Sequence, residues 1–265
     1  MNTYRAKSAA WKLAGLLLLT VAVGAQAAYV VLSDGRRMDG TEIRMTADGS
    51  VVLTTDRGPV TLTKGQFKSA MADKVPGEWE KVGQAVQAKK YDDAITQLNE
   101  LARKYRGLGL DVQAIQMLAK VQMMKGDPEA AVAAIETLFR MNPAAKGSPE
   151  LAWSFREALL GAKQYDRLNT ELNEVVAGGL RPDAARAQVM RGDIKLAQGQ
   201  GEGAVMDYLR TVVFFGSEQA VQPEALFKAA DTLEKLRDPR AKEMFKKLVQ
   251  EYPNSPEAQQ ARSRI

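Results

Sequence analysis

Histidine and cysteine, the side chains that most often act as bases, nucleophiles and zinc ligands, are both absent from the 265 residues. Their absence excludes Cys- and His-based catalysis, disulfide bonds and the usual nitrogen and sulfur zinc sites. Carboxylates remain, and a pair such as Glu157 and Asp193 could in principle hydrolyse a glycosidic bond. The sequence contains no phosphate-binding loop, dinucleotide fingerprint or EF-hand loop. The composition therefore favours a binding protein without a cofactor over an enzyme.

The first 27 residues have the order of a secretory signal peptide. Three basic residues precede an apolar run from Leu13 to Val23, and the small residues of Ala25-Gln26-Ala27 follow. We predict cleavage after Ala27. The alternative is an uncleaved anchor, but this run is shorter than the roughly 20 apolar residues that span a bilayer. We expect a periplasmic or secreted mature chain with no stable membrane span.

The net charge argues against a nucleic-acid partner. Segment 1–27 carries three basic residues and no acidic ones, so its removal lowers the formal net charge from +5 to +2. A mature chain this close to neutrality lacks the strong positive field of a nucleic-acid-binding protein. The partner that we expect is therefore a protein or peptide.

Residues 28–67 are divided by turn signals such as Asp34-Gly35 and Asp48-Gly49 into short segments rich in Val, Thr, Ile and Leu. We predict a small antiparallel β meander of three or four strands, similar to an SH3-like or Sm-like barrel, and a linker at 68–75. A module of this size is too small for comfortable stability alone, so it should pack on the helices or on a partner. The predicted strands are Tyr29–Leu32, Thr41–Thr46, Val51–Thr55 and Val60–Thr63.

Helical signals replace strand signals in residues 76–265. Seven prolines stand where a helix would begin, because proline fits the first turn of a helix but not its interior. Asp127, Ser148, Asp238 and Ser255 precede four of them and are predicted N-caps. The prolines are Pro76, Pro128, Pro149, Pro182, Pro223, Pro239 and Pro256.

An internal repeat runs through this helical region. Anchor residues recur at a spacing of about 37, within the range of helical solenoids, and large apolar residues follow each anchor at helical spacing. We predict a mostly α, solenoid-like array of about five helix pairs, in which stacking creates the core. The anchors are Ala94, Ala131, Leu168, Ala204 and Ala241. Their followers are Leu98, Leu101, Ile135, Leu138, Leu172, Val175, Tyr208, Phe245 and Leu248.

These residues resemble the tetratricopeptide repeat family over 76–265. The segment from Trp79 to Gly83 matches the Trp and Leu-Gly of the family's first helix, and Gln113 to Pro143 fits one whole repeat. The third unit departs from the pattern, because Leu168 stands where a small residue is expected. Segment 245–256 is similar to repeats of bacterial envelope proteins that coordinate Tol-Pal function or outer-membrane assembly.

The resemblance implies a protein-binding concave face formed by the first helix of each pair. Carried over position by position, it places eight candidate partner-binding residues there; the alternatives are an ordinary solvated face and, for Trp153, a place in the core. The family's Lys and Asn clamp for a C-terminal carboxylate is not reproduced. The candidates are Glu80, Gln84, Gln87, Gln116, Lys120, Trp153, Glu157 and Asp193.

Three hypotheses about function follow. The first is an exported periplasmic scaffold whose array binds a protein segment, with a component of the cell envelope as the expected partner. The second is a structural subunit of an envelope or pilus-like assembly, and the third is a hydrolase with paired carboxylates. Residues 255–265 are predicted to form a helix that covers the last repeat with Ala258, Ala261 and Ile265, because an array otherwise ends in an exposed apolar face.

Overall fold

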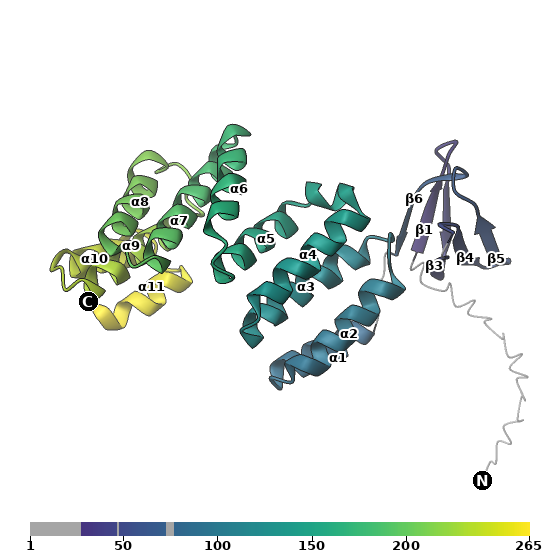
Figure 1. Cartoon of the computed structure of the whole chain (residues 1–265), viewed down its shortest axis with the longest axis horizontal. Coiled ribbons are helices and arrows are strands. Elements are labelled where there is room, and N and C mark those ends of the chain that lie inside the picture. Colours follow the sequence, from purple (N-terminus) through teal and green to yellow (C-terminus); the bar gives the residue numbers. More distant parts are fainter. Residues whose placement is uncertain (1–27, 47, 73–76) are drawn as a thin grey trace, which may run out of the picture. The chain divides into compact units, whose positions relative to one another are not determined.

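The computed structural model describes residues 28–46, 48–72 and 77–265. The signal peptide predicted for 1–27 lies outside these ranges. Contacts divide the chain into two units, with the boundary between Lys74 and Val75. The first unit is built from strands and the second from helices, and each is described by itself (Figure 1).

The strands of the first unit form two three-stranded antiparallel sheets, ordered β2-β1-β6 and β3-β4-β5. Val30, Val51 and Leu53 are fully buried and form the centre of its core. Gly40 is required where β2 approaches β4, because a Cβ there would lie 2.5 Å from the carbonyl oxygen of Thr54. The strands are β1 (Ala28–Leu32), β2 (Arg37–Gly40), β3 (Glu42–Met45), β4 (Val51–Thr55), β5 (Gly58–Leu62) and β6 (Phe67–Ala72).

The predicted antiparallel strand module is confirmed, but it contains more strands than predicted, and part of the expected linker is a strand. The four predicted strands correspond to β1, β3, β4 and β5, but β2 and β6 were missed, and β1 pairs with β6 from the far end of the module. Strand β6 runs through most of the segment expected to be a linker at 68–75. Neither missed strand alternates strongly between apolar and polar residues: Arg37–Gly40 is mostly polar, and Phe67–Ala72 exposes two successive polar residues, Lys68 and Ser69.

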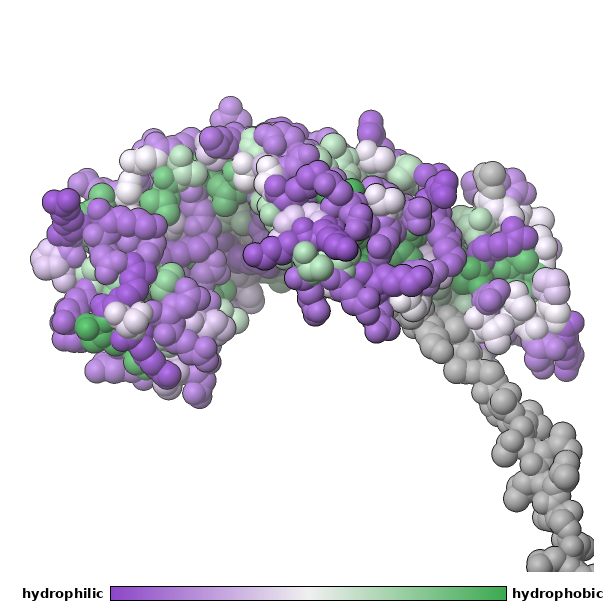
Figure 2. All heavy atoms as spheres, turned by 90° about the horizontal axis from the view of Figure 1, so that it is seen from below, coloured by the Kyte–Doolittle hydropathy of each residue, from purple (hydrophilic) through white to green (hydrophobic). Residues whose placement is uncertain are grey.

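The second unit confirms the predicted array of five helix pairs, and its pairs stack in chain order (Figure 1). We call the members of each pair the first and the second helix. On the side shown in Figure 2 its surface is largely hydrophilic. The pairs are α1 (Glu78–Gln87) with α2 (Tyr91–Lys104), α3 (Leu110–Lys125) with α4 (Pro128–Met141), α5 (Pro149–Gly161) with α6 (Tyr165–Ala177), α7 (Arg181–Ala197) with α8 (Gly201–Phe214), and α9 (Gln222–Lys235) with α10 (Arg240–Glu251).

Three short elements complete the unit. A 3₁₀ turn, η1 (Pro143–Gly147), separates α4 from α5. Helix α11 (Pro256–Ala261) and η2 (Arg262–Arg264) follow the last pair. Ala258 and Ala261 are fully buried against Phe245 and Leu248, which confirms the predicted cover over the last repeat. Ile265 does not take part as expected, since it remains exposed.

The predicted capping residues fix several helix starts. The side chains of Asp127 and Ser255 accept hydrogen bonds of 3.0 Å from backbone amides in the first turns of α4 and α11. Ser148 caps α5 through a longer bond of 3.4 Å to the amide of Leu151. Asp238 differs from the prediction, because it precedes the N-cap of α10, Pro239, by one residue; it accepts from the amide of Arg240 at 2.9 Å. Each bond satisfies a donor that has no partner within its helix.

The turns between the two helices of the five pairs share one backbone conformation. One residue of every turn has a positive φ, and the amide after it bonds back to a carbonyl of the first helix, as in a Schellman motif. Glycine adopts this conformation without strain, whereas lysine or arginine does so at a cost. The positive-φ residues are Lys89, Gly126, Lys163, Gly199 and Arg237.

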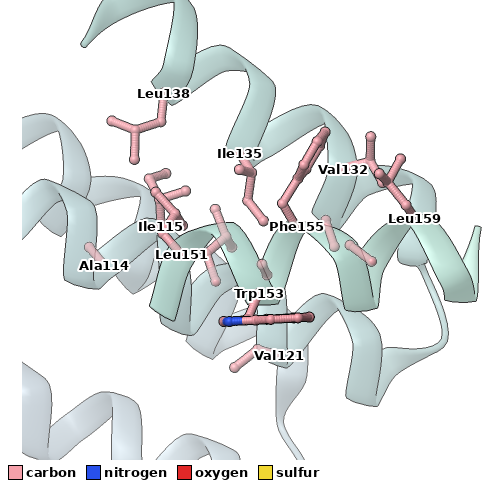
Figure 3. Packing of buried hydrophobic residues seen from close by; sticks show 14 of the residues in the cluster. Ala114, Ile115, Val121, Val132, Ile135, Leu138, Leu151, Trp153, Phe155 and Leu159 are labelled. Carbon is pink, nitrogen blue, oxygen red and sulfur yellow. The ribbon is translucent and has the colours of Figure 1, made fainter. Parts of the chain in front are cut away.

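All five anchors are buried, as predicted, and the large residues that follow them fill the space between helices. Around α5 two aromatic side chains take opposite directions. Phe155 points toward α4, close to Ile135, whereas Trp153 lies on the other side of α5, near Val121 of α3 (Figure 3). The core is therefore continuous across the middle of the array.

Candidate functional site

A groove of about 400 Å³ lies on the side of the array formed by first helices. Its lining comes from α5, α7 and α9, together with Met123 near the end of α3. Two of the predicted partner-binding residues, Glu157 and Asp193, line it. We call it the first-helix groove; its other lining residues are Leu160, Gly161, Arg186, Val189, Met190, Glu224 and Lys228.

Ion pairs between successive first helices form the rim of this groove. The guanidinium of Arg186 on α7 lies 2.9 Å from the Glu157 carboxylate on α5. The ammonium of Lys228 on α9 lies 2.7 Å from the Asp193 carboxylate on α7, and 2.6 Å from Glu224 of its own helix. Each pair therefore links one repeat to the next.

Asp193 also links the first-helix groove to α8, the second helix of its own pair. It accepts a hydrogen bond of 2.8 Å from the hydroxyl of Tyr208 on α8, a side chain that is otherwise fully buried. Burial and then the Asp193 charge raise the pKa of Tyr208, so the hydroxyl stays protonated and donates. Burial alone lowers the pKa of Lys228, but the carboxylates of Asp193 and Glu224 outweigh burial and raise it.

The groove has an apolar floor between these charges. Met123 and Leu160 are half-buried, and Val189 and Met190 lie beneath the surface. An apolar floor with a charged rim suits the side chains and backbone of a protein segment. The carboxylates of Glu157 and Asp193, the pair considered for glycoside hydrolysis, are each engaged in an ion pair with a cation of the next repeat.

The candidates on the first two pairs lie outside this groove. Glu80, Gln84 and Gln87 are exposed on α1; on α3, Lys120 is exposed and Gln116 is half-buried. Gln84 donates to Glu80 of its own helix at 3.4 Å. Within the described part of the chain, none of the five has a side-chain hydrogen bond or ion pair to another helix, so their polar groups remain open to a partner.

Trp153 belongs to the core, so its prediction as a partner-binding residue is corrected. The side chain is only 6% exposed. The guanidiniums of Arg186 and Arg156 lie 4.2 Å and 4.9 Å from the centre of its ring and cover it. A partner therefore meets the arginines and not the indole.

Sequence reasoning missed Arg186 and Lys228, the cations that neutralise the predicted carboxylates. They lie 29 and 35 residues beyond Glu157 and Asp193, respectively. The offset of 35 is close to one repeat length, so a search for opposite charges one repeat apart could have found Lys228, whereas the offset of 29 to Arg186 is about two helical turns shorter. The sequence of the helix that carries a carboxylate does not by itself show that its cation lies on the first helix of the next repeat.

A second signal lies 12 residues before each anchor, where the first helix crosses the second. Small or apolar residues occupy this position in four pairs, and in α7 an added Cβ at Gly192 would overlap the ring of Tyr208. In α1 the crossing residue is the buried Val82; Gly83, matched above to the family's glycine, has open space around it. The third pair differs because it carries Arg156. The crossing residues are Val82, Ala119, Arg156, Gly192 and Ala229.

Two other kinds of site are absent from the residues that the structure describes. No group of acidic residues there could hold a metal ion. None of the helices drawn in Figure 1 combines the length and the apolar character that a membrane crossing needs.

Comparisons with known proteins concern the helical unit. Residues 224–255, which include α9 and α10 almost entirely, match the tetratricopeptide repeat family. No curated protein matches the chain. It is similar to the solved structure of MamA, residue 41 to the end, from Desulfovibrio magneticus RS-1, with 18% identity, a TM-score of 0.46, and coverage of 70% of this chain and 94% of that one. A thermophilic tetratricopeptide repeat protein from Thermus thermophilus is also 18% identical, with a TM-score of 0.43 and coverage of 71% and 94%.

Residues 224–255 thus carry the sequence pattern of the tetratricopeptide repeat family, and the five helix pairs form a solenoid with a similar pair architecture. The five pairs share this architecture: a first helix, a left-handed turn, a second helix and a buried anchor.

Proposed function

We propose that the protein is an exported scaffold whose helical array binds a segment of another protein, a component of the cell envelope, along the first-helix side. The observation that carries this proposal is the first-helix groove, with its apolar floor between Leu160 and Met190 and its ion-paired rim. The exposed polar residues of α1 and α3 extend the same side toward the N-terminal end of the array.

Residues 1–27 support the assignment to an exported, periplasmic protein, because they have the charged, apolar and small-residue order of a signal peptide. The resemblance of segment 245–256 to repeats of Tol-Pal and outer-membrane assembly proteins supports an envelope partner. N-terminal sequencing of the protein from an osmotic-shock fraction should begin at Ala28. Retention of Met1 or Asn2 in the mature protein would overturn export by this route.

Site-specific crosslinking tests the binding side. A photoreactive phenylalanine analogue placed at Leu160, in the first-helix groove, should give a discrete adduct with one envelope protein in living cells. The same analogue at Lys242, which is exposed on the second helix α10, is the matched control and should give none. Equal adducts from both positions, or none from Leu160, would contradict the proposal.

One observation favours the second candidate, a subunit of an envelope assembly held by contacts between copies. Val213 and Phe214, at the end of α8, are 71% and 65% exposed, and such apolar side chains suit self-association. Size-exclusion chromatography with light scattering separates the two functions. A monomer supports the scaffold, and a large oligomer that Phe214→Ser disperses supports the assembly subunit.

A further inference from the structure

A larger groove, of about 560 Å³, lies between the second helices α4 and α6, with α5 as its floor and η1 at one end. We call it the second-helix groove. It faces away from the first-helix groove: on α5, Glu157 and Gly161 line one, whereas Ala152 and Phe155 line the other. At 3.6 residues per turn these two sets of residues lie on opposite sides of the helix.

The crossing of α5 and α6 explains why a groove opens here. This pair carries Arg156 and Leu168 at the two crossing positions, whereas Ala119 and Ala131 occupy them in the preceding pair. Large side chains hold helices apart, and α6 lies less closely against α5 than the second helix of any other pair against its first. The space that results is lined by Arg156 itself.

The guanidinium of Arg156 does not have hydrogen-bond partners for all of its donors in this position. Its side chain is 11% exposed and makes one ion pair, of 3.2 Å, with Glu171 on α6. Its Nε is buried without a hydrogen-bond partner. Burial lowers the pKa of Arg156, although the Glu171 charge opposes that shift. The pair therefore adds little positive potential, and the open cations must come from elsewhere in the groove.

Two such cations lie at the η1 end. Arg140 donates only to the hydroxyl of Thr137, on its own helix, at 3.1 Å. Lys146 lies 5.8 Å from the centre of the Phe139 ring. Within the described residues neither has a carboxylate partner, whereas Arg167, at the other edge, is paired with Glu136.

Aromatic rings lie beside these two cations. Phe139 and Phe155 both line the groove and pack edge to face, with ring centres 5.6 Å apart. Phe155 is buried and supports Phe139, which is half-buried and offers the accessible part of this apolar surface. Open cations next to such a surface match a segment that alternates carboxylates with apolar side chains.

Basic side chains also lie on the other side of α6. A groove of about 420 Å³ between α6 and α8 is lined by Arg191, Lys195 and Arg210, with Asp207 as its acidic residue. Asp207 pairs with both Lys195 and Arg210, and Arg191 donates to the amide oxygen of Asn173. An extended segment that crosses α6 would therefore meet uncompensated positive charge on both sides.

We propose that the second-helix groove binds an extended acidic protein segment, with its carboxylates near Arg140 and Lys146 and an apolar side chain on Phe139. This site goes beyond the proposed function, because it lies on the opposite side of the array from the first-helix groove. The scaffold then has two faces of different charge: a first-helix groove lined by three carboxylates and two cations, and second-helix grooves in which cations predominate.

A protein segment fits this site better than a membrane or a nucleic acid. The groove is recessed between helices, so a flat lipid surface cannot reach its aromatic floor. A nucleic acid carries a negative charge at every nucleotide, so its backbone cannot avoid the three carboxylates that also line the groove, Glu136, Glu171 and Glu174. A flexible peptide can place its charges between these groups.

Fluorescence anisotropy on the full chain tests the proposal with a labelled peptide of about eight residues that alternates Glu and Phe. The double variant Arg140→Gln/Lys146→Gln should weaken binding about tenfold. Lys242→Gln, the same change on the exposed face of α10, should leave it unchanged. Thermal melts of both variants should match the wild type, since Arg140 and Lys146 are exposed.

Amide shifts from nuclear magnetic resonance then locate the peptide. Shifts confined to α4, η1, α5 and α6 support the second-helix groove, whereas shifts on α7 and α9 would place the peptide in the first-helix groove and overturn the inference. Absence of binding, or equal binding by the double variant, also overturns it. The inference is also overturned if the chain binds phosphatidylglycerol vesicles or single-stranded DNA more tightly than the peptide and the double variant abolishes that binding. None of these results affects crosslinking from Leu160.

Discussion

The first helices at the two ends of the array use their polar residues differently. On α5, α7 and α9, charged side chains such as Glu157 and Asp193 are bound to cations of the next repeat. On α1 and α3, side chains of similar type, such as Gln87 and Lys120, have no partner on another helix within the described residues. The first-helix side of the array therefore has a C-terminal part whose ion pairs stabilise the stacked helix pairs and an N-terminal part whose polar side chains are open to solvent.

This difference teaches that residue type and helical position do not determine whether a polar side chain binds a partner or holds repeats together. The deciding factor is whether the next first helix carries an opposite charge within reach. Asp193 has Lys228 at 2.7 Å, whereas Lys120 has no such neighbour among the described residues. Binding residues are thus best sought where the ion pairs between repeats stop.

The largest effect should come from Asp193→Ala. The change leaves the Lys228 ammonium with only Glu224 and leaves the buried hydroxyl of Tyr208 without an acceptor. We expect unfolding free energy to fall by about 2–3 kcal/mol, the cost of breaking a partly buried, hydrogen-bonded ion pair. Urea denaturation followed by circular dichroism measures it.

The matched change in the open region is Gln84→Ala. Gln84 bonds only to its own helix, so unfolding free energy should change by less than about 0.5 kcal/mol. If the two variants lose similar stability, the division between a stabilising and an open part of the first-helix side is wrong.

A smaller effect separates two glycines inside first helices. Gly192→Ala places a methyl group against the buried ring of Tyr208 and should cost about 1–3 kcal/mol through overpacking. Gly83→Ala meets open space and should instead stabilise α1 by up to about 1 kcal/mol, because alanine favours helix. Thermal melts of the two variants should shift in opposite directions. A shared direction would show that the crossing in α7 can relax.

The smallest effect concerns acid. Burial would raise the pKa of Asp231 on α9, but hydrogen bonds from Lys235 and Arg264 outweigh it and hold the pKa below its ordinary 3.8. A lowered folded-state pKa stabilises the fold at pH above 3.8, and this stabilisation is lost as the pH falls through the folded-state value. Hydrogen exchange, corrected for the intrinsic pH dependence of amide exchange, should therefore accelerate in α9 to α11 before it does in α5 and α6 between pH 5 and 3, roughly the interval over which such a carboxyl titrates. Uniform acceleration along the array would contradict this order.

The sequence predicted those parts of the fold that rest on local or periodic signals. Anchors such as Ala131, and caps such as Ser255, each act within one helix or one pair, so their spacing reveals them. Strand β2 was missed because Arg37–Gly40 owes its conformation to pairing with β1 and not to its own residues. Contacts between distant segments leave little trace in a single sequence.

The site was predicted in part, for the same reason. Glu157 and Asp193 do line a groove, but the cations that hold them come from the following repeat. Trp153 was placed on the binding face because the family's pattern was carried over position by position, and only the stacked arginines show that it is covered. The departure at Leu168 was visible in the sequence, but the groove that it opens with Arg156 was not.

The left-handed turns have a mechanical consequence. Every pair is closed by the same hydrogen-bonded turn, whereas the connections between pairs differ in length, from residues 178–180 between α6 and α7 to residues 142–148, which contain η1, between α4 and α5. The turn within each pair is therefore fixed by hydrogen bonds, whereas the connections between pairs should differ in flexibility. A pulling force along the array should lengthen it first at its two longest connections, residues 142–148 between α4 and α5 and residues 215–221 between α8 and α9.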